Sequence, residues 1–293
     1  MKTLFPARPV IVVVVLLAIL SLAGCQKNIT TQDEATGTRS AVNLYLTDDP
    51  SLVFDQLWLD MQKLEIKAED DSQSKHETEH QGEVDENDKR GDSSGGWVTV
   101  NINPGVYNIL KFRNGLDTLF ARASFPAIHQ LKKLRITLGS KNSITFNGVN
   151  VPLTLKGNDN FIVIKTEAFS VNINNGGLSN LWIDIDAARS VGRNGNDFEL
   201  KPSVKLFSKE TTGRMEGSVL PKEVNTLIMA VNGTDTASAK PGQEGEFAFT
   251  GLKPGAYSVI YHAVSGNYND TTIRNIIVKA KEDTKLPNIT LHK

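Results

Sequence analysis

Short runs of alternating apolar and polar residues recur along most of this chain, separated by Gly, Asn, Asp and Pro. Alternation with a period of two is typical of β-strands, and little in the sequence repeats at helical spacing. The pattern predicts a mainly all-β fold with one short helix at residues 115–123. Strands are expected at residues 42–46, 54–67, 97–102, 106–112, 131–138, 143–146, 151–155, 161–165, 181–185 and 198–206.

The predicted strand at residues 54–67 changes phase in its middle. Leu57, Leu59 and Met61 share one parity, whereas Leu64 and Ile66 share the other. An extra residue in a strand moves the following side chains to the opposite face. We therefore expect a β-bulge near Gln62-Lys63 that keeps both apolar sets on the core side.

A polar segment at residues 208–213 divides the β pattern in two. Further strands are expected in the module that follows, at residues 217–220, 227–231, 246–249, 256–264, 272–279 and 288–291. This spacing favours a small sandwich. Its core is expected to contain Phe247, Phe249, Tyr257, Val259 and Tyr261. The sequence thus predicts two β-sandwich domains, residues 40–208 and 213–293.

The N-terminus has the pattern of an export signal. Lys2 and Arg8 precede an apolar run from Val10 to Leu20, which small residues then close. The run is shorter than the roughly 20 residues that a permanent membrane-spanning helix needs, so an uncleaved transmembrane anchor is the less favoured alternative. We expect residues 1–24 to be a signal peptide and the polar residues 25–39 to be a tether.

Leu22-Ala23-Gly24-Cys25 resembles the lipobox of bacterial lipoproteins. The resemblance implies that Cys25 receives a diacylglyceryl group and becomes the first residue, so that acyl chains hold the protein on a membrane. It also implies that Gln26 permits sorting to the outer membrane. The expected location is the cell envelope, facing the periplasm or the outside.

Residues 69–92 form a strongly acidic insertion in the first domain. Ten acidic residues stand there against three basic ones, and Val84 is the only large hydrophobic residue. Such a segment cannot bury enough apolar surface to order itself. We expect a mobile loop between two strands.

The insertion contains His76-Glu77-Thr78-Glu79-His80, which matches the H-E-x-x-H pattern of zinc proteases. That chemistry needs an amphipathic helix, and the flanking residues offer no apolar face. Chance composition is the favoured interpretation. Weak, non-catalytic metal binding by His76 and His80 stays an alternative, and no cofactor is expected.

Other features also argue against an enzyme or a nucleic-acid-binding protein. The sequence lacks a nucleophile elbow and a phosphate-binding glycine loop, and we interpret His129 and His262 as ordinary strand or loop residues. Without Lys2 and Arg8, 30 basic residues remain against 33 acidic ones, a net charge near −3. Nucleic-acid binding would need a concentrated basic face.

Two predicted strands each place a tryptophan and an aspartate on one face. Trp58 and Asp60 alternate with leucines, and Trp182 and Asp184 alternate with Leu181 and Ile183. An aromatic ring beside a carboxylate can bind a sugar, since the ring stacks on the pyranose and the acid accepts hydroxyl hydrogen bonds. These four residues are the predicted ligand site. The alternative is that both tryptophans are buried under another layer.

Two resemblances cover most of the chain. The motifs at residues 217–219, 245–249 and 251–257 resemble carboxypeptidase regulatory-like, transthyretin-like sandwiches, a wider class that includes starch-binding-like modules. This resemblance implies a spacer or a carbohydrate-binding unit. Residues 40–206 resemble an uncharacterised bacterial lipoprotein domain, through residues 46–50, 114–119, 134–139 and 198–202.

Two functional hypotheses follow. The first is a non-enzymatic, membrane-anchored lipoprotein that binds carbohydrate or another envelope component. The second is a structural or assembly lipoprotein that docks a protein partner through the edges of its sandwiches.

Overall fold

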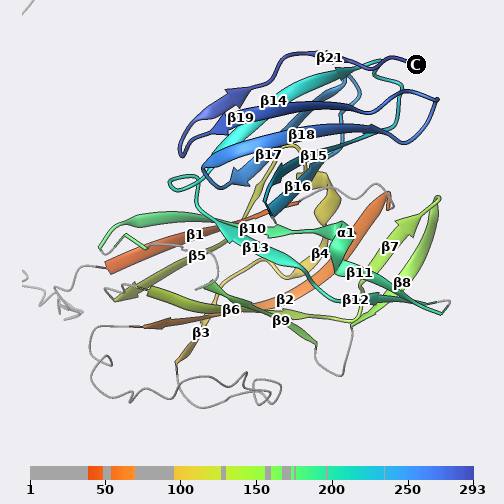
Figure 1. Cartoon of the computed structure of the whole chain (residues 1–293). Helices are drawn as coiled ribbons and strands as arrows, with labels where there is room; N and C mark the ends of the chain where they lie inside the picture. Colours follow the sequence, from red (N-terminus) through yellow and green to blue (C-terminus); the bar gives the residue numbers. More distant parts are fainter. Residues whose placement is uncertain are drawn as a thin grey trace, which may run out of the picture. The chain divides into compact units, whose positions relative to one another are not determined.

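Two consecutive β-sandwiches make up the described part of the chain (Figure 1). The structure, a computed structural model, describes residues 39–48, 54–69, 96–126, 130–155, 160–166, 173–174, 176–195, 197–233 and 235–293. The predictions for the signal peptide, for Cys25, for His76, His80 and His129, and for nearly all of the tether and the insertion lie outside these residues. Within them, no helix is long and apolar enough to cross a membrane.

The first sandwich is built from two sheets. The smaller sheet has the strand order β13-β10-β1-β5, in which β1 and β10 are parallel. The larger has the order β11-β12-β8-β7-β2-β6-β9, with β3 and β4 also paired to β2. The bounds are β1 (Arg39–Thr47), β2 (Gln56–Glu69), β3 (Trp97–Val100), β4 (Gly105–Asn108), β5 (Thr118–Pro126), β6 (Gln130–Leu138), β7 (Ser143–Phe146), β8 (Val149–Leu155), β9 (Phe161–Lys165), β10 (Leu178–Ile185), β11 (Val191–Asn194), β12 (Asp197–Leu200) and β13 (Val204–Phe207).

The predicted bulge in β2 is confirmed. The register against β6 shifts between Met61 and Lys63, and the apolar residues on both sides of the shift are fully buried. They pack in one core with Leu44 of β1 and Ile183 of β10. The side chains of β2 and β10 that do not enter this core point outward, from the outer faces of the two sheets.

The predicted helix at residues 115–123 is wrong. Residues 118–126 form β5, whose backbone pairs with β1 from Arg39 to Leu46. Phe120, Ala121 and Phe125 enter the core there. Pairing with a buried strand outweighs the weak local preference for a helix. The helices that form are the short η2 (Ile109–Phe112) and α1 (Ala187–Ser190).

The second sandwich follows β13 after a short linker. One sheet has the order β17-β14-β20, with β21 also paired to β14, and the other has β16-β15-β18-β19. The core residues predicted from the sequence are all buried. The bounds are β14 (Gly213–Leu220), β15 (Thr226–Asn232), β16 (Asp235–Ala239), β17 (Glu246–Leu252), β18 (Gly255–Ala263), β19 (Thr271–Val278), β20 (Asp283–Lys285) and β21 (Ile289–Thr290). Both sandwiches belong to one unit, residues 37–293.

Candidate functional site

Trp58 and Asp60 lie on the outer face of the larger sheet. The Trp58 ring is half-buried, and its Nε1 donates a hydrogen bond of 3.0 Å to Gln56. The Asp60 carboxylate is buried and accepts hydrogen bonds from the Lys141 backbone N–H, at 3.0 Å, and from the Gln62 amide. The Asp60 backbone N–H donates to Asn142. Asp60 therefore holds the turn between β6 and β7, a structural use of this carboxylate.

Trp182 lies on the outer face of the smaller sheet and is only 8% exposed. The register places Trp182 directly between Tyr45 of β1 and Phe207 of β13. Its ring stacks against both, with centroid distances of 4.9 Å to Tyr45 and 5.9 Å to Phe207. Its Nε1 donates a hydrogen bond of 2.7 Å to Asp117. The Lys209 ammonium group lies 4.2 Å from the centre of the Trp182 ring and 3.1 Å from the Asp117 carboxylate. The ring faces are thus occupied by protein groups.

The structure does not bring the two predicted tryptophan–aspartate pairs together. The leucine and isoleucine residues beside Trp58 and Trp182 enter one shared core. The tryptophans therefore point away from that core on opposite sides of the first sandwich. A single aromatic platform formed by both rings is not present. The sequence placed each residue on the correct kind of face, but it contained no signal for what covers that face.

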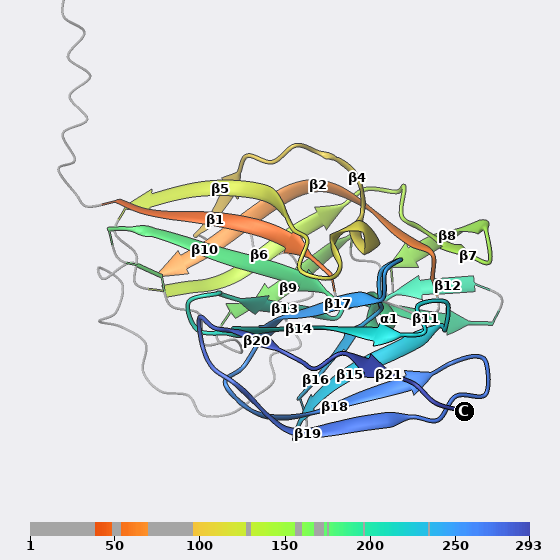
Figure 2. The ribbon, with the colours of Figure 1, turned by 90° about the horizontal axis from the view of Figure 1, so that it is seen from above.

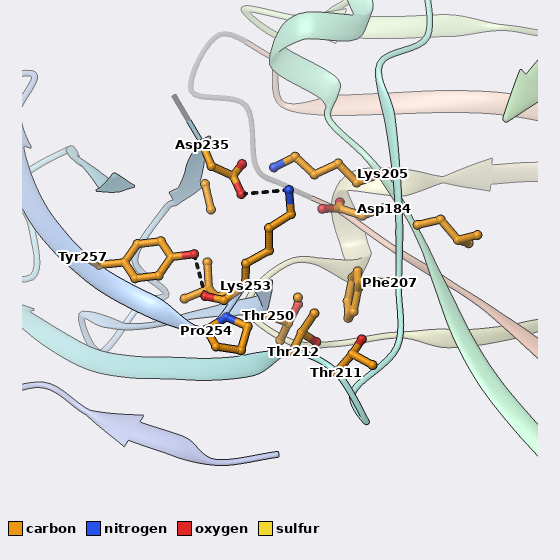
Figure 3. A pocket seen from close by; sticks show the side chains of 14 residues that line it. Asp184, Lys205, Phe207, Thr211, Thr212, Asp235, Thr250, Lys253, Pro254 and Tyr257 are labelled. Atoms are coloured by element: carbon orange, nitrogen blue, oxygen red, sulfur yellow. Dashed lines mark hydrogen bonds and ion pairs between the residues drawn. The ribbon is translucent and has the colours of Figure 1, made fainter. Parts of the chain in front are cut away.

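Asp184 lies at a cavity of about 650 Å³ whose walls come from both sandwiches. Phe207 and Lys205 of β13 line it on one side, and Asp235 and Lys253 line it on the other. Figure 3 shows the four charged side chains pointing toward a common region. Hydroxyl groups of Thr211, Thr212 and Thr250 add hydrogen-bonding capacity.

Three side chains that line the cavity make contacts within or beside it. Lys253 Nζ lies 3.9 Å from the Asp235 carboxylate, and Lys205 Nζ donates to the Thr236 carbonyl at 3.3 Å. The Tyr257 hydroxyl donates to the Lys253 carbonyl at 2.9 Å (Figure 3). Burial raises the pKa of Tyr257, so this hydroxyl stays a neutral donor at physiological pH.

The linker between the sandwiches is tied back on itself beside the cavity. The Ser208 carbonyl accepts from the backbone N–H groups of Thr211 and Thr212, both at 3.1 Å, and from the Thr212 hydroxyl at 2.8 Å. Gly251, with φ +69°, allows the Phe207 ring to approach, since a Cβ there would lie 2.6 Å from the ring. The cavity wall is therefore a fixed part of the fold.

The arrangement is suited to binding a polar ligand. Two ammonium groups, two carboxylates and several hydroxyls converge beside two aromatic rings, as in sites that orient small polar molecules. Among the described residues, no group of three or more His, Cys, Asp or Glu side chains could hold a metal ion. His262 lies elsewhere, with Nδ1 2.9 Å from Asp270 on the exposed surface, and this contact lowers the pKa of Asp270.

Sequence reasoning found Asp184 but missed the three charged residues that share its cavity. Lys205, Asp235 and Lys253 are far apart in the sequence and stand in no motif with Asp184. Lys253 lies in the motif at residues 251–257, which indicated a type of sandwich but not what this lysine would face.

Comparisons with known proteins describe a family without an assigned activity. The model of a domain of unknown function (DUF4382) matches residues 39–202. No curated protein matches the chain.

Matching solved structures include the minor pilin GBS52 of Streptococcus agalactiae, which is 10% identical. The match covers 86% of this chain and 96% of the pilin chain, with a TM-score of 0.21. The shaft pilin SpaA of Lactobacillus rhamnosus GG matches at 8% identity, with 87% and 98% covered and a TM-score of 0.20. A cohesin–X-dockerin complex of Acetivibrio cellulolyticus matches at 22% identity, 27% of this chain and a TM-score of 0.22. The chain spans 56% of the length of that last structure.

Proposed function

The chain belongs to the family of domains of unknown function DUF4382, and from this premise we propose that it is a non-enzymatic lipoprotein of the bacterial envelope. Its ligand is a carbohydrate or another polar envelope component, and it binds in the cavity beside Asp184. The observation that carries the proposal is the convergence of Asp184, Lys205, Asp235 and Lys253 on that cavity from two sandwiches.

The chemistry of the cavity matches a ligand rich in hydroxyl groups. Carboxylates accept hydrogen bonds from sugar hydroxyls, ammonium groups donate to ring and hydroxyl oxygens, and Phe207 offers an apolar wall. Because the walls come from both sandwiches, a bound ligand would also bridge them. The resemblance of residues 213–293 to carboxypeptidase regulatory-like and starch-binding-like modules supports the same class of ligand.

The proposed anchor rests on the sequence around Cys25. Two or three acyl chains, palmitate among them, each contribute about 0.8 kcal/mol per buried CH₂, so the protein would stay on its membrane. Gln26 favours the outer membrane as the destination. Labelling cells with a palmitate analogue should mark the chain, and the Cys25→Ser variant should stay unlabelled. Equal labelling of both would contradict the anchor.

Ligand binding is tested with residues 26–293, which include the whole unit 37–293. They are screened against a broad glycan panel together with an Asp184→Asn, Lys253→Gln double variant. A matched control, Lys222→Gln with Glu244→Gln, removes an exposed ion pair of the second sandwich and likewise leaves the net charge unchanged. The proposal predicts saturable binding that the double variant loses and the control keeps. Binding that the double variant retains would place the ligand elsewhere.

One observation favours the alternative function in assembly. Strand β19 ends its sheet, and Ile277 on it is 56% exposed. An exposed strand edge can pair with a strand of another protein. In that case the glycan panel would give no binding, and cross-linking in the intact envelope would join the β19 edge to a partner protein.

A further inference from the structure

The outer face of the larger sheet carries a concentrated positive charge at one end. The register places Lys67 of β2 directly opposite Lys133 of β6, and Lys133 directly opposite Lys165 of β9. Their neighbours Ile66, Leu134 and Ile164 are buried in the core, so these three lysines all point outward. Directly opposed residues have Cβ atoms about 5 Å apart, so the three lysines form one row across the sheet.

A second row of residues adds to this charge. Arg135, opposite Glu65, binds that carboxylate at 2.8 Å, and Lys63 binds it at 2.7 Å. Glu65 is nearly buried beneath them. Two cations thus share one carboxylate, and the lysine row lies directly beside them. We call Lys63, Lys67, Lys133, Arg135 and Lys165 the cationic face.

An aromatic ring stands at the border of the cationic face. Trp97 of β3 is directly opposite Lys67, is half-buried, and lies 4.4 Å beneath the Arg135 guanidinium. A tryptophan beside lysines is typical of protein surfaces that lie in a membrane interface.

The cationic face lies at the end of the sandwich where the described chain begins. Arg39, the first described residue, pairs with Pro126 at the end of β5. Strand β6 begins four residues after Pro126, at Gln130, and Lys133 lies near its start. Figure 2 shows the starts of β1 and β6 at the same end. Arg39 follows Cys25 by 14 residues, which span at most about 50 Å.

We propose that the cationic face docks on the anionic lipid headgroups of the membrane that holds the anchor. This inference rests on the proposed lipid anchor, which would keep the face within one tether length of the headgroups. Docking would also orient the first sandwich, since its larger sheet would then face the membrane. The forces are charge attraction and insertion of the Trp97 border into the interface.

Residues 70–95 are the alternative occupant of the cationic face that the experiment must distinguish from lipid. They carry nine acidic residues against three basic ones, and they join Glu69 to Gly96, next to Lys67 and Trp97. A segment of opposite charge attracts cations as anionic lipid does. The experiment therefore includes a variant in which a short Gly-Ser linker replaces residues 70–95.

The test measures co-sedimentation of unlipidated residues 26–293 with vesicles. One set contains 30% phosphatidylglycerol in phosphatidylcholine, and the other is pure phosphatidylcholine. The proposal predicts partitioning onto the anionic vesicles only, weakening as salt is raised. Each lysine near such a surface contributes about 1 kcal/mol, so a Lys67→Gln, Lys165→Gln double variant should bind about 30-fold more weakly. A Lys222→Gln, Lys279→Gln control with the same change in charge should bind within about twofold of the parent chain.

Three results would overturn the proposal. They are no binding by the intact chain, binding that appears only when residues 70–95 are replaced, and equal weakening in the control. Because the protein in this test carries no lipid, its outcome is independent of Cys25 labelling, and failure of the anchor is recognised separately. Circular dichroism of each variant checks that the sandwiches remain folded.

Discussion

Two strands of this protein carry nearly the same four residues and meet different surroundings. Leu57-Trp58-Leu59-Asp60 lies in the larger sheet, where Trp58 is half-buried and Asp60 holds a turn. Leu181-Trp182-Ile183-Asp184 lies in the smaller sheet, where Trp182 is covered and Asp184 lies at a cavity. Alternation decides which face a side chain takes. Groups distant in the sequence decide whether that face is open.

The difference arises from the residues that reach each face. Asp117, from the segment before β5, and Lys209, from the linker, both contact Trp182. The Trp58 ring instead donates its hydrogen bond locally, to Gln56 of its own strand. A covered face can form one wall of a binding cavity, whereas an open face meets solvent or another surface.

Removal of the two tryptophan rings should give the largest contrast. Trp182→Ala deletes a buried ring together with its stacking and its hydrogen bond, so the free energy of unfolding should fall by about 3–5 kcal/mol. Trp58→Ala removes a half-exposed ring and should cost about 1 kcal/mol. Urea unfolding of both variants measures the difference. Equal losses would show that the two faces are not covered differently.

Removal of the Asp60 carboxylate should have an intermediate effect. Asp60→Ala leaves the Lys141 backbone N–H and the Gln62 amide without their acceptor, and should lower the free energy of unfolding by about 2 kcal/mol. Glycan binding should be unchanged, because Asp60 lies on the face opposite the cavity. The same urea series and the glycan panel check both statements. Loss of binding in a folded Asp60→Ala variant would contradict the assignment of the site.

The smallest effect should appear in the pH dependence of stability. The Arg135 hydrogen bond holds the pKa of Glu65 below its ordinary value of 4.5, although burial acts in the opposite direction. A carboxyl group with a lowered pKa in the folded state stabilises the fold above its unfolded pKa. That contribution is lost as the pH falls below 4.5 and through the folded pKa. Unfolding at pH 6, 4 and 3 should show a steeper decline for the parent chain than for Glu65→Gln, and parallel declines would contradict it.

Most buried faces of the first sandwich could be predicted from the alternation of apolar and polar residues within single strands. The change of parity between Met61 and Leu64 allowed only a bulge if both apolar sets were to be buried, and the bulge is present. The helix expected at residues 115–123 failed because a weak local preference was overruled by pairing with β1. Local patterns therefore predict which faces are buried better than they predict isolated short elements.

The candidate site was predictable only in part. Trp182 and Asp184 were singled out because they alternate with core residues, and Asp184 does lie at the cavity. Lys205, Asp235 and Lys253 could not be joined to it, because their proximity depends on how β13 and the linker place the second sandwich. The stacking of Tyr45 and Phe207 on Trp182 likewise needs strand order, which no single strand encodes.

The most direct test of the cavity as the binding site uses single-tryptophan reporters. A Trp58→Phe, Trp97→Phe variant keeps Trp182, whose ring stacks on the cavity residue Phe207, and a Trp97→Phe, Trp182→Phe variant keeps Trp58. Both are titrated with the glycan panel while emission is recorded. We predict a saturable change in the emission of Trp182 and none in that of Trp58. A change confined to Trp58, or no change in either reporter, would contradict the account.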